Sequence, residues 1–266
     1  MSMGLISAAI LGLIFGSFFN VVIYRTPIAL EAKIKGKTRN SLLEQLAWPA
    51  SFCPNCKNKI SWFDNIPVIS WFLLRGKCRQ CRTLIKVRYF IVELLSAIIF
   101  SYYYFKFGPS FEALYWVVLF SILLVLFFID AETFFLPDFL TVPLIIWGLL
   151  GSHLGIVDIN FYDSVVGGIA GFLILYLINL FYKIYRKVDG LGAGDFKLLS
   201  AFGVLFGWKS LLPIMAISSS LALFFILLMI VFKQKKFQST SMIPLGPFLI
   251  LSSLFMYANL YVLKLF

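Results

Sequence analysis

The chain has 266 residues, of which 61% are hydrophobic, 18% aromatic and only 13% charged, with a mean hydropathy of +0.94. This composition excludes an ordinary soluble globular protein and predicts an integral membrane protein. The formal net charge of +11 implies no nucleic-acid partner, because most of the basic residues fall in loops where they orient membrane helices.

Apolar segments recur along the whole chain at lengths close to the roughly 20 residues that a membrane-spanning helix needs. They cover 3–24, 89–107, 111–130, 139–157, 163–182, 197–207, 210–232 and 243–263. The sixth is too short to cross unaided. The first has no basic region before it, so we expect it to stay as an anchor and not to be a cleaved signal peptide. We therefore predict an all-α polytopic membrane protein with about eight transmembrane helices.

Basic residues are distributed unequally between the two predicted sides of the membrane. If the N-terminus lies outside, all but Lys106, Lys209 and Lys264 of the 23 Lys and Arg residues face inward. Lys and Arg near span ends are retained on the cytoplasmic side. The inward segments, among them the loop 25–88, are therefore expected in the cytoplasm, against the inner leaflet of the lipid bilayer.

The loop 25–88 contains two C-x2-C pairs, Cys53 with Cys56 and Cys78 with Cys81. Four thiolates at this spacing can bind Zn²⁺ tetrahedrally, and a site closed by four protein ligands is structural and not catalytic. A reducing cytoplasm disfavours disulfides. Redox cysteines and an empty site remain open as alternatives. The aromatic stretch 62–72 between the pairs is expected to form the core of this small unit or a face resting on the membrane interface.

Two acids are expected at the same cytoplasmic depth, Asp130 at the end of the third segment and Asp195 at the foot of the sixth. Two neighbouring carboxylates cannot both ionise cheaply, so they share one proton, as in an aspartic protease dyad. Asp138 follows a proline and is expected simply to start a helix. Glu93, inside the second segment, could pair with Arg88 or serve a second site.

The stretch VDGLGAGDFKLL at 188–199 precedes and includes Asp195. It lacks the strand and helix context of a phosphate-binding loop. A flexible linker remains open, as does a clear approach for an extended substrate beside Asp195. We expect Asp189 and Lys183 to be solvated loop residues. A proton-coupled transporter or channel with a relay through Asp130, Glu93 and Asp195 is a further alternative, disfavoured because the acids gather at one face. A zinc-dependent binding module is another.

Six motifs in order give the chain a resemblance to the bacterial type IV prepilin peptidases, which are polytopic aspartic proteases with a G-x-G-D motif. They are GSFFNVVIYRTP (16–27), WFDNIPVISWFLLRGKC (62–78) with the flanking cysteines, RYFIVE (88–93), DAETFFLPDFLTVPL (130–144), GAGDFKLL (192–199) and IPLGPFL (243–249). The resemblance implies cleavage of prepilin or pseudopilin precursors after a leader-terminal glycine, at the cytoplasmic face of a bacterial inner membrane. It implies Asp130 and Asp195 as the catalytic pair and a secondary role for Asp138.

The resemblance also implies a second activity and a division into three parts. Family members with the cysteine loop are typically bifunctional and methylate the new N-terminal amine with S-adenosylmethionine. The implied parts are the first transmembrane helix (1–24), a cytoplasmic loop domain associated with methyl transfer (25–88), and the membrane peptidase domain (89–266). No motif locates the cofactor pocket, and the segment 28–52 matches none of the family's motifs.

Overall fold

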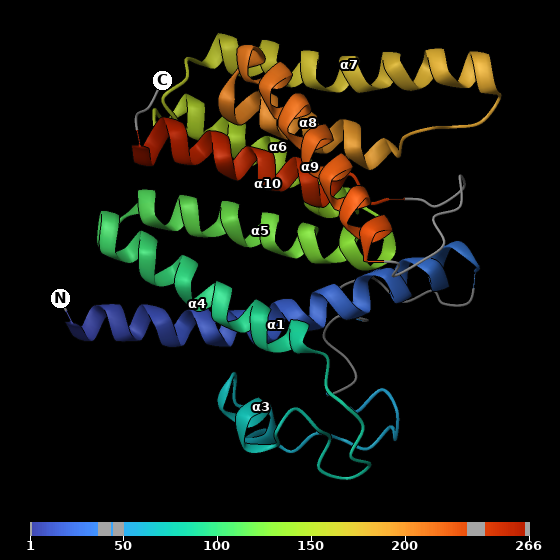
Figure 1. Cartoon of the computed structure of the whole chain (residues 1–266). Helices are drawn as coiled ribbons and strands as arrows, with labels where there is room; N and C mark the ends of the chain where they lie inside the picture. Colours follow the sequence, from blue (N-terminus) through green and yellow to red (C-terminus); the bar gives the residue numbers. More distant parts are fainter. Residues whose placement is uncertain (1, 37–43, 45–50, 233–242, 264–266) are drawn as a thin grey trace. The chain divides into compact units, whose positions relative to one another are not determined.

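The computed structural model describes residues 2–36, 44, 51–232 and 243–263 (Figure 1). The predicted basic loop 233–241, Lys264 and much of the unmatched segment 28–52 lie outside these residues. Helices dominate the described chain, as predicted. They are α1 Ser2–Ile34, η1 Trp62–Asn65, α3 Ile69–Leu73, α4 Val87–Phe107, α5 Phe111–Thr133, α6 Asp138–His153, α7 Phe161–Arg186, α8 Ala193–Phe206, η2 Trp208–Ser210, α9 Leu211–Val231, α10 Gly246–Tyr257 and η3 Ala258–Leu263.

Within the described residues, five helices are long and apolar enough to cross a membrane, so the chain is a multi-pass membrane protein. They cover Met3–Ala32, Val87–Phe107, Phe111–Thr133, Phe161–Arg186 and Trp208–Val231. The other predicted segments correspond to the shorter helices α6, α8 and α10. Helix α1 ends at Ile34 and not at residue 24 as predicted, because its last turns, ALEAKI, are rich in good helix formers.

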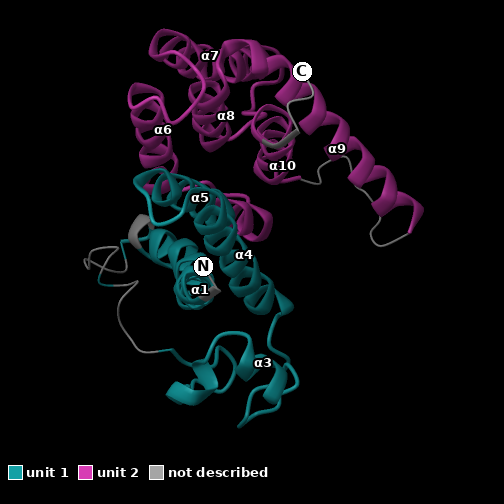
Figure 2. Cartoon of the chain, turned by 90° about the vertical axis from the view of Figure 1, so that its left-hand side faces the viewer, with its two compact units in different colours: residues 1–125 teal, residues 126–266 magenta. Residues whose placement is uncertain are grey.

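The chain forms two compact units, residues 1–125 and 126–266, and the boundary falls inside α5 (Figure 2). In the first unit, α1 packs closely against α4. A Cβ on Gly12 would lie 2.6 Å from Cα of Ala97, and a Cβ on Gly16 would lie 2.7 Å from Cα of Glu93. Small residues allow membrane helices to approach this closely. The Asn20 side chain also donates to the Tyr89 carbonyl at 2.9 Å.

The second unit is built around α8, which contacts α6, α7, α9 and α10. Leu198, Leu199 and Phe202 on α8 are fully buried. The Ser200 hydroxyl donates to the Gly168 carbonyl of α7 at 2.7 Å, which satisfies a buried polar group between the two helices. Helix α8 has 14 residues and is surrounded by these four helices. Their packing fixes the position of Asp195 in its first turn.

Candidate active site

Asp130 lies in the last turn of α5 and is only 4% exposed. Its Oδ2 accepts a hydrogen bond from the main-chain N–H of Gly246 at 3.0 Å. Gly246 is the first residue of α10, and free N–H groups at a helix N-terminus favour a negative charge. A Cβ on Gly246 would lie 2.6 Å from the same oxygen, so a larger residue would displace the carboxylate. The IPLGPFL motif thus supplies a main-chain donor to Asp130.

Asp195 occupies the first turn of α8, outside the five candidate membrane-spanning helices, and it is partly buried. Its Oδ2 accepts from the Gly192 N–H at 3.2 Å. Burial, followed by the charge of Asp130, raises the pKa of Asp195 to about 7, although the Gly192 amide opposes this shift. The two predicted acids therefore lie close enough to interact electrostatically, and the pair can retain one proton near neutral pH.

The glycines before Asp195 have different surroundings. A Cβ on Gly194 would lie 2.6 Å from Cβ of Leu136, which is buried, so Gly194 makes room for the chain itself and not for a substrate. Gly192 is exposed, and the nearest atom to a Cβ there would be Oδ2 of Asp195 at 3.3 Å. Space for an approaching backbone is therefore found at Gly192.

Asp138 begins α6 after Pro137, as the sequence predicts. Its carboxylate is 69% exposed and accepts from Nζ of Lys197 at 2.6 Å. Lys197 lies two residues beyond Asp195, so this ion pair joins the starts of α6 and α8. Asp138 is thus joined by Lys197 to the helix that carries Asp195.

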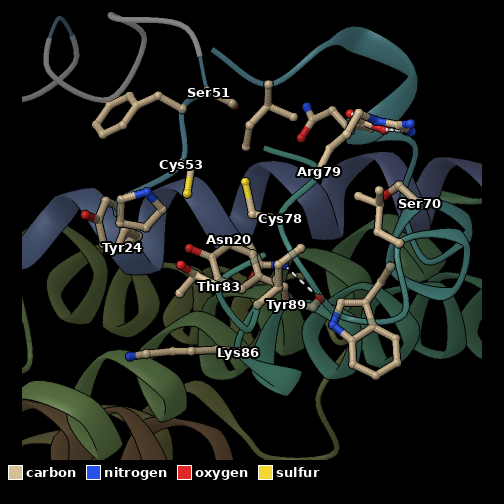
Figure 3. A pocket seen from close by; sticks show the side chains of 18 of the residues that line it. Asn20, Tyr24, Ser51, Cys53, Ser70, Cys78, Arg79, Thr83, Lys86 and Tyr89 are labelled. Carbon is tan, nitrogen blue, oxygen red and sulfur yellow. Dashed lines mark hydrogen bonds and ion pairs between the residues drawn. The ribbon is translucent and has the colours of Figure 1, made fainter. Parts of the chain in front are cut away.

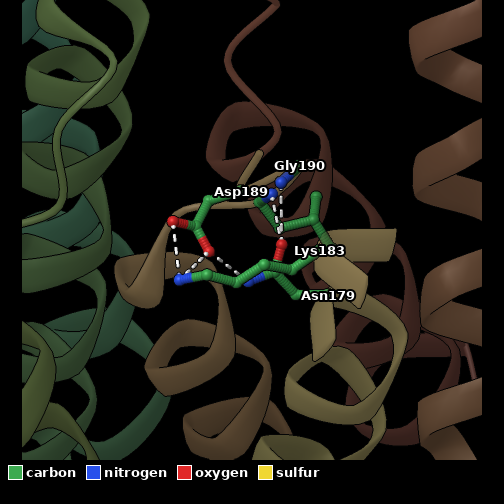
Figure 4. Close-up of polar contacts among 5 residues, drawn as sticks. Asn179, Lys183, Asp189 and Gly190 are labelled. Carbon is green, nitrogen blue, oxygen red and sulfur yellow. Dashed lines mark hydrogen bonds and ion pairs between the residues drawn. The ribbon is translucent and has the colours of Figure 1, made fainter. Parts of the chain in front are cut away.

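A side-chain contact that the sequence did not predict anchors the loop before Asp195 (Figure 4). Oδ1 of Asn179 on α7 accepts from the N–H groups of Gly190 at 2.8 Å and Leu191 at 3.0 Å. Its Nδ2 donates to Asp189 at 3.3 Å, and Nζ of Lys183 lies 3.1 Å from the same carboxylate. Asp189 and Lys183 are 58% and 56% exposed, as expected of solvated loop residues, and they pair with each other beside the Asn179 amide. The one sequence signal for Asn179 is its position as a lone amide in an apolar run.

The four cysteines form one cluster in the first unit, with no disulfide among them, and their Sγ atoms all lie within 4.8 Å of one another. The two pairs fold alike: the N–H of Cys53 donates to Asn58 O, and that of Cys78 donates to Thr83 O, both at 2.9 Å. Hydrogen bonds from the Thr83 hydroxyl and amide lower the pKa of Cys81 to about 5. A hydrogen bond with the Asn58 backbone opposes the shift at Cys56, but burial and the neighbouring thiols outweigh it and raise the pKa of Cys56 to about 11. This donor set fits a tetrahedral zinc ion and could hold one.

A cavity of about 410 Å³ lies beside the cysteine cluster in the same unit (Figure 3). Its wall includes residues of α1 and α4, among them Asn20, Tyr24, Tyr89 and Glu93. Glu93 is 8% exposed, and its Oε2 accepts from the Val68 N–H at 2.7 Å. A buried carboxylate facing a cavity is typical of a ligand site. The sequence left the role of Glu93 open, and the structure assigns it to this wall.

Comparison with known proteins gives matches over most of the chain. The profile of the bacterial peptidase A24 N-terminal domain matches residues 10–107, and that of the type IV leader peptidase family matches residues 117–232. No solved structure matches the chain.

Curated relatives are 38% to 39% identical to the chain over the aligned residues. A prepilin leader peptidase/N-methyltransferase of Aeromonas hydrophila is 38% identical over 247 residues, which cover 89% of this chain and 84% of that protein. The protein of the same name from Neisseria gonorrhoeae is 38% identical over 241 residues, 86% of this chain and 84% of the relative. The protein of the same name from Klebsiella pneumoniae is 39% identical over 211 residues, which cover 79% of this chain and 89% of that protein.

Proposed function

Because the chain belongs to the type IV leader peptidase family, we propose that it is a membrane aspartic endopeptidase that removes the basic leader from type IV prepilin-like precursors after a glycine. The observation that supports this most directly is the pair Asp130 and Asp195, each accepting a main-chain N–H at the start of a helix and each within electrostatic reach of the other. The family gives no support to the alternative of a proton-coupled transporter.

The pair performs general acid and base catalysis in this proposal. The ionised member removes a proton from water, whose oxygen forms a bond to the scissile carbonyl carbon. The protonated member donates to the carbonyl oxygen, and the C–N bond then breaks as the amine leaves with a proton. Gly192, next to Asp195, leaves space for the extended substrate backbone. The site faces the cytoplasm of a bacterial inner membrane, where a basic leader is retained.

The test is cleavage of a purified prepilin by the chain reconstituted in lipid vesicles. Mass spectrometry of the products is expected to show one cut, directly after the glycine that ends the basic leader. Absence of cleavage by a protein that retains its fold and its vesicle orientation, or a cut at unrelated positions, would refute the proposed peptidase.

We further propose that the unit containing the cysteines methylates the new N-terminal amine with S-adenosylmethionine and that the cavity beside the cluster holds this cofactor. The cavity of about 410 Å³ falls within the usual range of small-molecule sites, roughly 300–1,000 Å³. The Glu93 carboxylate would attract the cationic sulfonium, and Tyr24 and Tyr89 offer aromatic surface. When bound, the cofactor supplies the methyl group. A structural zinc ion held by Cys53, Cys56, Cys78 and Cys81 would keep this wall in place.

Replacing Glu93 with glutamine is expected to lower methyl transfer by more than ~10-fold while leader cleavage stays within about twofold of wild type. Glutamine can still accept from the Val68 amide, so the wall stays intact and only the charge is lost. Transfer of labelled methyl groups to a cleaved pilin measures the effect. Glu112→Gln, on α5 of the same unit, is the matched control. Unchanged methylation in the Glu93 variant would place the cofactor elsewhere.

Replacing Asn179 with leucine is expected to lower kcat for cleavage by about 30-fold with little change in KM. Two hydrogen bonds to the loop are lost, at about 1 kcal/mol each, and a change of 1.36 kcal/mol is tenfold in rate. The loop that leads to Asp195 then samples unproductive positions. Initial rates at varied prepilin concentration separate kcat from KM.

Lys183→Met provides the control for this anchor, since it removes only an exposed ion pair with Asp189. We expect its kcat to stay within about twofold of wild type. Equal losses in the Lys183 and Asn179 variants, or a loss confined to KM, would argue against positioning by the Asn179 amide.

A further inference from the structure

The short helix α3 exposes an apolar face outside the predicted spans. Ile69, Phe72 and Leu73 are 55%, 60% and 77% exposed. Their spacing of i, i+3 and i+4 puts them on one side of the helix. These three side chains lie in the same unit as the four cysteines but contribute little to its core. A contiguous apolar face of this kind marks an interaction surface.

The position of α3 within the first unit indicates what covers this face. The rings of Trp71 and Phe72 lie 5.3 Å and 5.2 Å, between centroids, from the ring of Phe90. The Val68 N–H, at the start of α3, donates to Glu93. Phe90 and Glu93 belong to the first two turns of α4, one of the helices long and apolar enough to cross the membrane. Helix α3 is therefore fastened to the end of a membrane-spanning helix.

We propose that α3 is an interfacial helix whose face of Ile69, Phe72 and Leu73 is covered by the lipid bilayer. A side chain beside the first turns of a spanning helix lies at the boundary between headgroups and acyl chains, where apolar side chains gain from burial. The exposed Arg75 and Lys77 that follow α3 can reach the headgroups from there. The bilayer continues from α4 onto α3, so a single lipid surface covers both.

Contact with lipid on one side of α3 has a consequence for its other side. Ser70 and Trp71 line the cavity that also contains Glu93. A helix immersed at the interface holds this cavity at the membrane surface. That is the level at which a substrate anchored by a transmembrane helix would present a polar terminus. The inference rests on contacts in the first unit and holds whatever reaction the cavity serves.

Tryptophan fluorescence in vesicles made with brominated acyl chains tests the lipid contact. Leu73→Trp and Ile69→Trp place a reporter on the face, and the wild-type emission is subtracted as background. Gln80→Trp, at an exposed position between Cys78 and Cys81, is the control in the same small unit. We expect the added tryptophan at residue 69 or 73 to be quenched by brominated lipid at least twofold more than that at residue 80, and to be protected from aqueous iodide.

Quenching at residues 69 and 73 that does not exceed quenching at residue 80 would overturn the proposal. If instead these reporters respond to added prepilin and not to brominated lipid, the face binds a protein partner and the proposed lipid contact is wrong. Leader cleavage is not the readout, so this result is independent of whether the peptidase proposal succeeds. Zinc content equal to that of wild type verifies that each variant retains the cysteine cluster.

Discussion

Replacing either Asp130 or Asp195 with asparagine is expected to lower kcat for leader cleavage by at least ~10³-fold, because asparagine can neither accept nor hold the shuttled proton. The substitutions are nearly isosteric. The amide oxygen of asparagine can still accept from Gly246 at one position and from Gly192 at the other, so both helix starts keep their partners. Single-turnover cleavage of a purified prepilin measures the loss.

Asp138→Asn is the matched control, because it changes a nearby carboxylate that is 69% exposed and pairs with Lys197. Its kcat is expected to stay within about tenfold of wild type. The double variant of Asp130 and Asp195 should lose little more than either single one, since the two acids act as a unit. Cleavage near the wild-type rate in either single variant would show that the pair is not catalytic.

Removing one cysteine ligand is expected to release the metal and unfold residues 51–85. Structural zinc sites contribute about 10–16 kcal/mol to the folding of zinc-finger peptides, far more than the apolar contacts of so small a unit. Cys78→Ser should lower bound zinc from about one ion per chain to a small fraction. Methyl transfer should then be lost to a greater extent than cleavage, because Asp130 and Asp195 both lie in the other unit.

Metal analysis, limited proteolysis and the two activity assays on the same preparation measure these effects. Lys59→Gln, an exposed change between the cysteine pairs, is the control and should retain full zinc. Full zinc content in Cys78→Ser, or wild-type chain purified without metal yet resistant to protease, would contradict a structural zinc site.

The sequence was most informative about residues whose side-chain chemistry and predicted position relative to the membrane both indicate a role. Asp130 and Asp195 could be paired from the predicted topology, and the structure brings them within electrostatic reach. The cysteine spacing likewise predicted the cluster that the structure contains. Both predictions depend on residue types that are rare or costly in a membrane protein, and such residues are seldom present without a role.

The remaining features depend on which segments pack together, and no local pattern reveals that. Asn179 anchors a loop that begins ten residues later, and nothing in the sequence of α7 connects the two. The glycines before Asp195 left open a clear approach for a substrate, but at Gly194 this space is filled by Leu136, which is far away in sequence. The cavity beside Glu93 combines α1, α4 and the cysteine loop, so it exists only once these three are assembled.

The amide that serves Asp130 comes from Gly246, 116 residues further along the chain. During biosynthesis, both acids therefore leave the ribosome well before this donor does. A nascent or truncated chain that stops short of α10 has both carboxylates but lacks the N–H group that fixes one of them. The order of synthesis thus delays completion of the Asp130 environment until the first turn of α10 has been made.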